Sequence, residues 1–258
     1  MRSNLAAKLR QKTQETDSSK LTNMFPGFPP EALQFLRNLA RNNRREWFQP
    51  RKEIFETKIK APMMDLVEAI NAELLRFAPA HINDPKKAIY RIYRDTRFSP
   101  DKTPYKTHIA AIFPLRGTER HSTAGYYFHI APKSIAIAMG AYMPGPDELY
   151  AIRSWLAEHH QEFRGAAKAL RKLMGELQGD SLARSPKGFD PEHPASDLVR
   201  RKAWYFATEL EPELVGSPKL APEIVKRFRA GAPMIEMLNK PLAEVKPRRA
   251  ASTRKLGA

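Results

Sequence analysis

The sequence predicts an α+β fold: a single domain in which helices cover an antiparallel β-meander, with flexible basic ends. Apolar residues recur at helical spacing before residue 78 and again after residue 146. Between these segments the period changes to two, in the short runs "AIYRIY", "THIAAIF", "AGYYFHIA" and "SIAIAMGAY". The runs lie too close together for crossover helices, so we expect antiparallel strands at 109–113, 126–130 and 135–139.

Helical segments are expected ahead of the sheet. The first follows Pro30 and a later one opens at Pro62, because proline suits the first turn of a helix. Asn43 is the expected N-cap of the segment between them, with Glu46 in the capping-box position. The apolar faces comprise Leu33, Leu36, Leu39 and Ala40 in the first helix, and Met63, Leu66, Val67, Ile70, Leu74 and Phe77 in the last.

After the strands the pattern returns to helix. The segment from Pro146 to about residue 163 carries an apolar face, and "AAKALRKLMGEL" predicts a second helix directly behind it. A Pro- and Gly-rich loop follows at 179–197, and loops of this length are often functional. "KAWYFATEL" is expected to add one more strand, and "APEIVKRF" to begin the last helix.

Composition limits the classes of structure and function that the chain can adopt. It has 258 residues, 42% of them hydrophobic, which is enough to bury a core. It has no cysteine, which excludes disulfides, thiolate metal sites and a cysteine nucleophile. No apolar run reaches the roughly 18–20 residues of a membrane helix, and no secretory signal is present. We therefore expect a cytoplasmic protein with no membrane association.

The net charge of +16 is unevenly distributed. Half of it lies in residues 1–22 and 240–258, which are polar and show no apolar periodicity. Such basic ends attract polyanions without specificity. We expect a flexible extension at 1–22, an α+β domain at 23–240 and a flexible basic tail at 241–258.

The stretch "YRIYRDTRFSPDKTPYKTH", residues 90–108, concentrates positive charge inside the expected domain, with Asp95 and Asp101 among its cations. In an extended segment Arg91 and Arg94 point to opposite faces, so one of them faces covered space and needs a partner. We predict a preorganised anion site, because clustered guanidinium and ammonium groups are typical of phosphate and carboxylate recognition. A structural network of ion pairs and a solvated basic face are the alternatives. The expected ligand-binding residues here are Arg94, Arg97, Lys102, Tyr105 and Lys106.

This stretch resembles the signature of the family called domain of unknown function 2461, through "RDTRFSPDKTPYKT". The resemblance extends to "NNRREWF", "GYYFHIAP", "LYAIRSWL" and "RSPKGFDPEHP", and covers roughly residues 25–240. It implies no particular reaction. It does mark the central motif and the later loop, and in that loop it marks Arg184, Pro186, Lys187, Gly188, Phe189, His193 and Pro194.

Other candidate residues lie outside the central stretch. Asp95, Asp101 and His193 are the candidate catalytic residues. Among the histidines, His193 is the best candidate for a general acid-base, because it lies in a loop. Arg153 and Lys187 complete the expected ligand-binding set, and an ordinary surface loop is the alternative for 184–202. We predict no metal and no cofactor, because the histidine spacings match no metal motif and no nucleotide-binding fingerprint is present.

Two classes of function fit these features. The first is a protein that binds a phosphorylated or other anionic small molecule, and no pattern decides whether it is also an enzyme. The second is a nucleic-acid-binding protein that uses the same basic patch, its aromatic residues and the basic ends. No helix-turn-helix, RNA-recognition or zinc-finger pattern is present, which favours the first. The sequence names neither a reaction nor an oligomeric state, nor whether 90–108 and 184–202 share a pocket.

Overall fold

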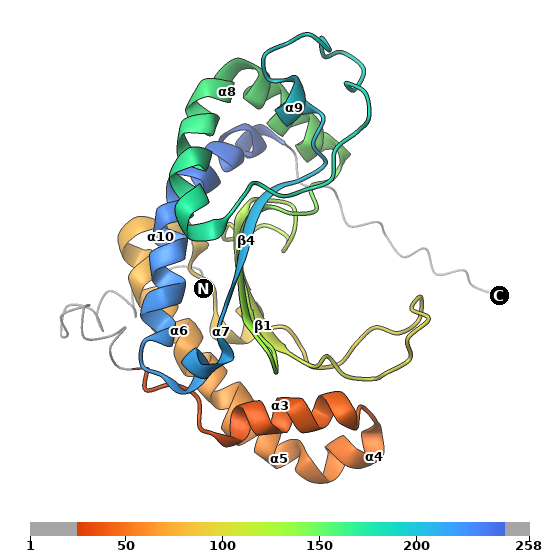
Figure 1. Cartoon of the computed structure of the whole chain (residues 1–258), viewed down its shortest axis with the longest axis vertical. Helices are drawn as coiled ribbons and strands as arrows, with labels where there is room; N and C mark the ends of the chain where they lie inside the picture. The colour runs from red at the N-terminus through yellow and green to blue at the C-terminus, as the bar shows by residue number, and fades with distance from the viewer. Residues whose placement is uncertain (1–24, 246–258) are drawn as a thin grey trace.

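The computed structural model describes residues 25–245 and has an α+β architecture, which confirms the predicted fold class (Figure 1). One four-stranded sheet has the order β1-β2-β3-β4, so each strand pairs with its neighbour in sequence. Its strands are β1 (Ile109–Phe113), β2 (Gly125–Ile130), β3 (Ile135–Ala141) and β4 (Trp204–Leu210). The α-helices are α3 (Glu31–Arg41), α4 (Arg45–Phe48), α5 (Lys52–Phe55), α6 (Ala61–Phe77), α7 (Pro85–Ala88), α8 (Pro146–Met174), α9 (Ser196–Val199) and α10 (Leu220–Asn239).

All three strand pairs are antiparallel, as predicted. In the register, Phe128 of β2 lies opposite Ala111 of β1 and Ile137 of β3. The expected fourth strand is β4, which pairs with β3. The "AIYRIY" run, in contrast, forms only isolated bridges, Ile89 with Ala111 and Tyr93 with Tyr105, because its chain turns away from the sheet edge into a long hairpin.

The helical segment before the sheet differs from the prediction at its second helix. Asn43 does not cap α4, whose N-cap is Arg44 with no side-chain hydrogen bond. Both polar atoms of the Asn43 amide instead bind the backbone of Tyr105, 62 residues away in sequence. Pro62 does lie in the first turn of α6, and a π-helix at Glu56–Lys60 joins α5 to α6. A tertiary contact has therefore replaced a local cap.

The two expected helices after the sheet form one element, α8. His159 has non-helical backbone angles inside it (φ −116°, ψ 23°), so the helix is kinked there. The long α10 packs on the sheet and against α6 and α8. Helix and strand approach closely at Gly231, where a Cβ atom would come within 1.9 Å of the Met139 sulfur. This glycine therefore permits the packing of α10 on β3.

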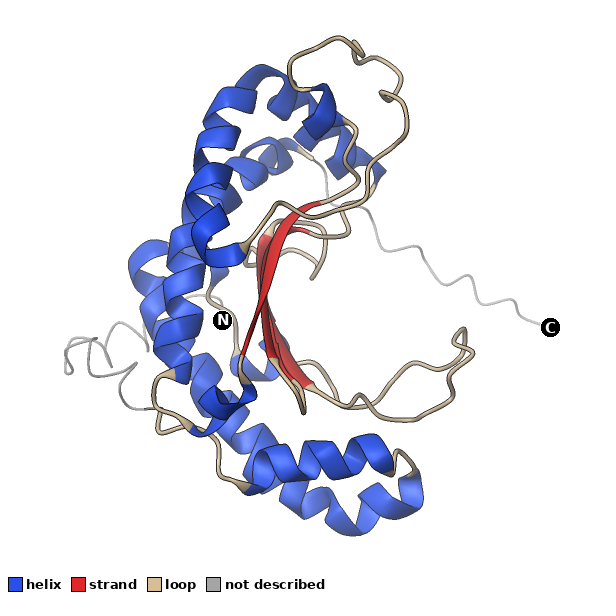
Figure 2. Cartoon of the chain, viewed as in Figure 1, coloured by secondary structure: helices blue, strands red, loops and turns tan. Residues whose placement is uncertain are grey.

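The core lies between the helices and one face of the sheet. The side chains that alternate inward on the strands are large and buried, and they include Tyr126, Phe128, Ile137, Met139, Trp204 and Phe206. Figure 2 shows the central helices on this side of the sheet, further helices reaching past both ends of the sheet, and loops extending beyond its other face. We call the second face the open face. It is the feature from which the candidate site is built.

The predicted ends lie largely outside the described residues. The predicted N-terminal extension, residues 1–22, and residues 246–258 of the predicted tail lie outside the described residues. Residues Lys240–Glu244 form a 3₁₀ helix after α10, and Leu242 within it is buried. Among the described helices, none is long and apolar enough to cross a membrane.

Candidate functional site

The basic stretch forms a hairpin that is anchored at its base by an aromatic contact. Tyr105 is 1% exposed, and its ring stacks on Phe48 with centroids 4.2 Å apart. The Asn43 amide donates to the Tyr105 carbonyl at 2.8 Å and accepts from its N–H at 3.0 Å. Tyr105, an expected ligand-binding residue, is thus buried in the core, where it attaches the hairpin to α4.

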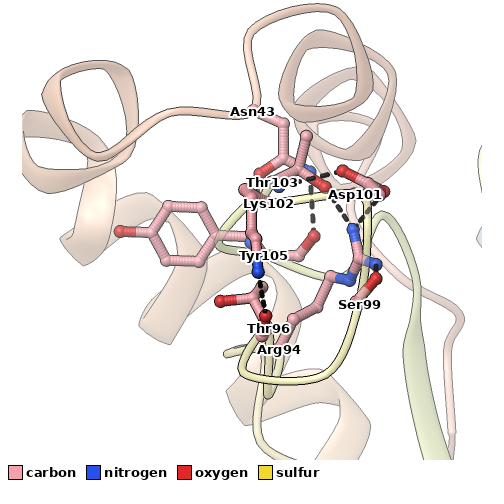
Figure 3. Close-up of polar contacts among 8 residues, drawn as sticks. All are labelled: Asn43, Arg94, Thr96, Ser99, Asp101, Lys102, Thr103 and Tyr105. Atoms are coloured by element: carbon pink, nitrogen blue, oxygen red, sulfur yellow. Dashed lines mark hydrogen bonds and ion pairs between the residues drawn. The ribbon is translucent and has the colours of Figure 1, made fainter.

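The hairpin tip, residues 94–103, contains a polar network around Arg94 (Figure 3). The Arg94 guanidinium pairs with the Asp101 carboxylate and donates to the Thr103 hydroxyl, with a longer contact of 3.4 Å to the Ser99 hydroxyl. Asp101 also accepts from the Thr103 N–H at 2.9 Å. This backbone hydrogen bond and the Arg94 contact lower the pKa of Asp101 to about 2. Arg94 therefore has the aspartate partner that its half-buried position requires.

The other cations of the tip are also engaged within it. Arg97 makes a two-pronged contact with the Asp95 carboxylate at 3.0 and 2.7 Å, and this contact lowers the pKa of Asp95 to about 2. The Lys102 ammonium donates to the Thr96 carbonyl at 2.9 Å (Figure 3). Each arginine of the tip is thus paired with one aspartate, so most of its charge is compensated locally.

A pocket of about 450 Å³ lies over the open face of the sheet. Part of its floor is made of small side chains, because several strand positions that alternate with the large core residues are alanines or glycines. In β3, for example, Ala136 and Ala138 face the pocket while Ile135 and Ile137 are buried on the other side. The alanines of the floor are Ala110, Ala136, Ala138 and Ala207.

The end of this pocket next to β1 and β2 is cationic. Lys106 and Arg120 both contact the Tyr90 ring, with Nζ and Cζ at 4.7 and 4.4 Å from its centroid. Burial lowers the pKa of Lys106, and the nearby charges of Arg91 and Arg120 lower it further. No carboxylate of the described residues forms an ion pair with Lys106 or Arg120. Arg91 does not line this pocket, and its charge also acts on Asp95 of the tip. We call Lys106, Arg120 and Tyr90 the cationic end.

Imidazole and phenol groups lie beside the cationic end. The rings of His108 and His129 are 4.8 Å apart, and the Tyr127 hydroxyl lies 3.1 Å from His129 Nδ1. Burial, followed by the neighbouring His129 and Lys106, lowers the pKa of His108 to about 4. Burial also lowers the pKa of His129 and raises that of Tyr127 to about 12. These groups are therefore neutral near pH 7 and can donate or accept hydrogen bonds.

Histidines do not combine into a metal centre in the described part of the chain, where no group of three or more His, Asp or Glu side chains could hold an ion. His121, which also lines the pocket, lies 3.4 Å from the Tyr90 hydroxyl. Burial and the adjacent Arg120 lower its pKa. It extends the row of neutral imidazoles along the pocket.

The loop before β4 lies at the other end of the molecule from the hairpin tip (Figure 1). The His193 ring accepts from the Ala195 N–H at 3.1 Å, and its centroid is 5.9 Å from that of His160. Arg153 donates to the Arg201 carbonyl at 2.9 Å, and Lys187 is exposed. The lining of the open-face pocket includes residues of 90–108 but none of 184–202. The structure thus brings only Lys106, of the predicted site residues, into this pocket.

Sequence reasoning missed most of the pocket lining, although a signal was present. The run "SIAIAMGAY" alternates large and small apolar residues, and the small ones share one face of the strand. A face of alanines leaves room above a sheet unless a helix covers it. The missed residues with polar or aromatic groups include Tyr90, His108, Arg120, His121, Tyr127, His129, Tyr142 and Tyr205.

Comparison with known proteins places the chain in a family without adding a reaction. No curated protein and no solved structure matches it. Residues 31–237 match the family described as conserved hypothetical protein (DUF2461). This match covers the helices from α3, the whole sheet and nearly all of α10. The chain therefore belongs to the DUF2461 family, as the resemblance of its hairpin motif implied.

Proposed function

We propose that the protein binds a small anionic ligand in the open-face pocket, at the cationic end formed by Lys106, Arg120 and Tyr90. The observation that carries the proposal is that Lys106 and Arg120 both contact the Tyr90 ring in the pocket lining, and neither forms an ion pair with a carboxylate of the described residues. Burial is the main cause of the lowered pKa of Lys106, and repulsion from the charges of Arg91 and Arg120 lowers it further. An anion bound between them would relieve this repulsion.

The surroundings of the cationic end favour a ligand with hydrogen-bonding oxygens. Neutral imidazoles and phenols can donate to phosphate or carboxylate oxygens without adding charge. Because the cationic end is partly removed from water, each ionic hydrogen bond there is stronger than at an exposed position. Phosphate and carboxylate are therefore the chemical groups that we propose for the ligand.

In this proposal the hairpin supplies Lys106, and its tip supports the position of this lysine. The Arg94–Asp101 and Arg97–Asp95 pairs hold the tip in one conformation. The backbone N–H of Lys106 is tied to the Ile92 carbonyl at 2.8 Å, next to the anchored Tyr105. A rigid hairpin lowers the entropic cost that binding must offset.

Calorimetric titration with inorganic phosphate and acetate tests the proposal. Lys106→Met should weaken binding about tenfold or more, because a charge-assisted contact contributes roughly 1.5–3 kcal/mol. The matched control is Lys102→Met, which removes an exposed lysine of the same hairpin and should leave the affinity unchanged. Equal losses in both variants, or no loss in Lys106→Met, would contradict the proposal.

Single-stranded nucleic acid is the second candidate ligand, and one observation favours it. Phe98 at the hairpin tip is 92% exposed, with the Arg97 guanidinium 5.7 Å from its ring centroid. An exposed ring beside a cation is suited to base stacking. Nucleic-acid affinity would fall steeply with salt concentration, whereas binding of a monovalent anion in the pocket would change little. Phe98→Ala should weaken only the nucleic-acid mode.

A further inference from the structure

The open-face pocket has two chemically different ends. The second end indicates which uncharged group the ligand contains in addition to its anionic group. At the β3–β4 end the lining changes from cations and imidazoles to Tyr142, Met143 and Tyr205. Tyr142 is 57% exposed and Met143 64% exposed. Large apolar side chains left open at the edge of a pocket favour an apolar partner. We call these three residues the aromatic end.

The aromatic end has a defined geometry. The rings of Tyr142 and Tyr205 are 5.1 Å apart and nearly perpendicular, with an interplanar angle of 78°. Gly140, between them in the pocket lining, has φ +135° and its backbone lies against that of Trp204 and Tyr205. Rings at this angle present both a face and an edge, which are the two surfaces that a further aromatic ring contacts favourably.

The floor is apolar where β3 and β4 form it. Ala138 and Ala207 lie opposite each other on β3 and β4, and Ala136 lies further along β3. The pocket crosses all four strands, a distance of about 14 Å at the usual strand spacing. A small inorganic ion at the cationic end would leave most of this length, and most of the volume of about 450 Å³, unfilled.

We propose that the ligand is a ring-bearing organic anion, with its phosphate or carboxylate at the cationic end and its ring on the alanine floor against Tyr142 and Tyr205. This inference rests on the proposed function and adds the class of molecule. The ring buries apolar surface on the floor, and the charge offsets the repulsion among the cations. Both parts of the ligand contribute to its affinity.

Titration with inorganic phosphate, phenyl phosphate and phenol tests the class of ligand. Phenyl phosphate should bind at least tenfold more tightly than inorganic phosphate, since burying a phenyl ring contributes roughly that factor or more. Phenol, which has the ring without the charge, should bind more weakly than phenyl phosphate. Equal affinities for phosphate and phenyl phosphate would leave the anion site standing and overturn the ring-binding inference. Binding of neither anion would overturn both.

Two variants identify where the ring lies. Ala138→Leu fills the floor and should reduce the affinity for phenyl phosphate to that for inorganic phosphate, which should itself be unchanged. Tyr142→Ser removes an exposed ring without disturbing the core, and should weaken only phenyl phosphate, by about threefold or more. The control is Ala131→Leu, at a half-buried alanine outside the pocket lining. If Ala138→Leu and Tyr142→Ser both bind phenyl phosphate like wild type, the ring does not bind there and the inference is overturned.

Discussion

The hairpin tip and the cationic end of the pocket are both basic, yet their charges are organised in opposite ways. In the tip, Arg94 and Arg97 each pair with an aspartate. At the cationic end, Lys106 has two neighbouring cations and a tyrosine ring, with no ion-pair partner among the described residues. The ion pairs of the tip resemble a structural network. The positive charges that line the pocket, in contrast, are not balanced by neighbouring carboxylates. Whether its cations have carboxylate partners, more than how many cations it contains, distinguishes a candidate anion site from a structural ion-pair network.

The largest effect is expected at the point where the hairpin is attached. Tyr105→Ala removes a buried ring stacked on Phe48 and should lower the free energy of unfolding by roughly 3–5 kcal/mol. Tyr93, its bridge partner, is 43% exposed, so Tyr93→Ala should cost much less. Urea denaturation of both variants measures the difference. Similar losses would show that the hairpin is attached in some other way.

The two regions should also respond to pH in separate windows. Burial lowers the pKa of His108 from 6.5 to about 4, so between these values the unfolded chain binds a proton that the folded chain excludes. The free energy of unfolding should therefore fall as the pH falls from 6.5 to 4, by roughly 2 kcal/mol after allowance for partial exposure. Buried His81 and half-buried His129, whose pKa values are also lowered, should add to this loss.

The tip should respond only at lower pH. Asp95 and Asp101 have pKa values of about 2 in the folded protein, against an ordinary value of 3.8, so the stability that they contribute is present above pH 3.8 and is lost towards pH 2. Urea denaturation at closely spaced pH values separates the windows. His108→Asn should flatten the dependence between pH 6.5 and 4 and leave the lower window unchanged. If His108→Asn left the pH dependence between 6.5 and 4 unaltered, this would contradict the assignment of that loss of stability to His108.

The smallest effect is expected within the tip, between its two ion pairs. Asp101→Ala leaves the half-buried Arg94 without its carboxylate and should lower the melting temperature by a few degrees. Asp95→Ala removes the partner of Arg97, whose side chain is 77% exposed, and should shift the melting temperature by about one degree or less. Thermal denaturation followed by circular dichroism compares them. The reverse order would show that Asp95 is the main brace of the hairpin.

More of the fold than of the pocket lining could be predicted from the sequence. Periodicity identified the antiparallel meander and its strands, because alternation on a sheet is a local property of the chain. The partners of Asn43 could not be predicted in this way, since its contact is with Tyr105, far along the chain. The pocket lining is likewise assembled from all four strands and from the loops that hold Tyr90 and Arg120.

The hairpin shows why a local sequence motif can lie next to the candidate site without supplying most of its residues. Residues 94–103 carry many cations, but which of them lack a partner depends on side-chain contacts that no spacing reveals. Lys106 was predicted as a ligand-binding residue, and it lies in the pocket lining together with Arg120, which the sequence did not single out. The alternation of large and small residues in β3 was the available signal for a hollow on the open face.

Locating a bound oxyanion tests the central claim most directly. Crystals of the full chain soaked in tungstate, an electron-dense oxyanion of the size and charge of phosphate, would show its position by anomalous scattering. The account predicts a peak at the cationic end, in contact with the Lys106 ammonium and the Arg120 guanidinium, with both ion pairs of the hairpin tip intact. A peak between Arg94 and Arg97 with their aspartates displaced, and none beside Lys106, would contradict the account.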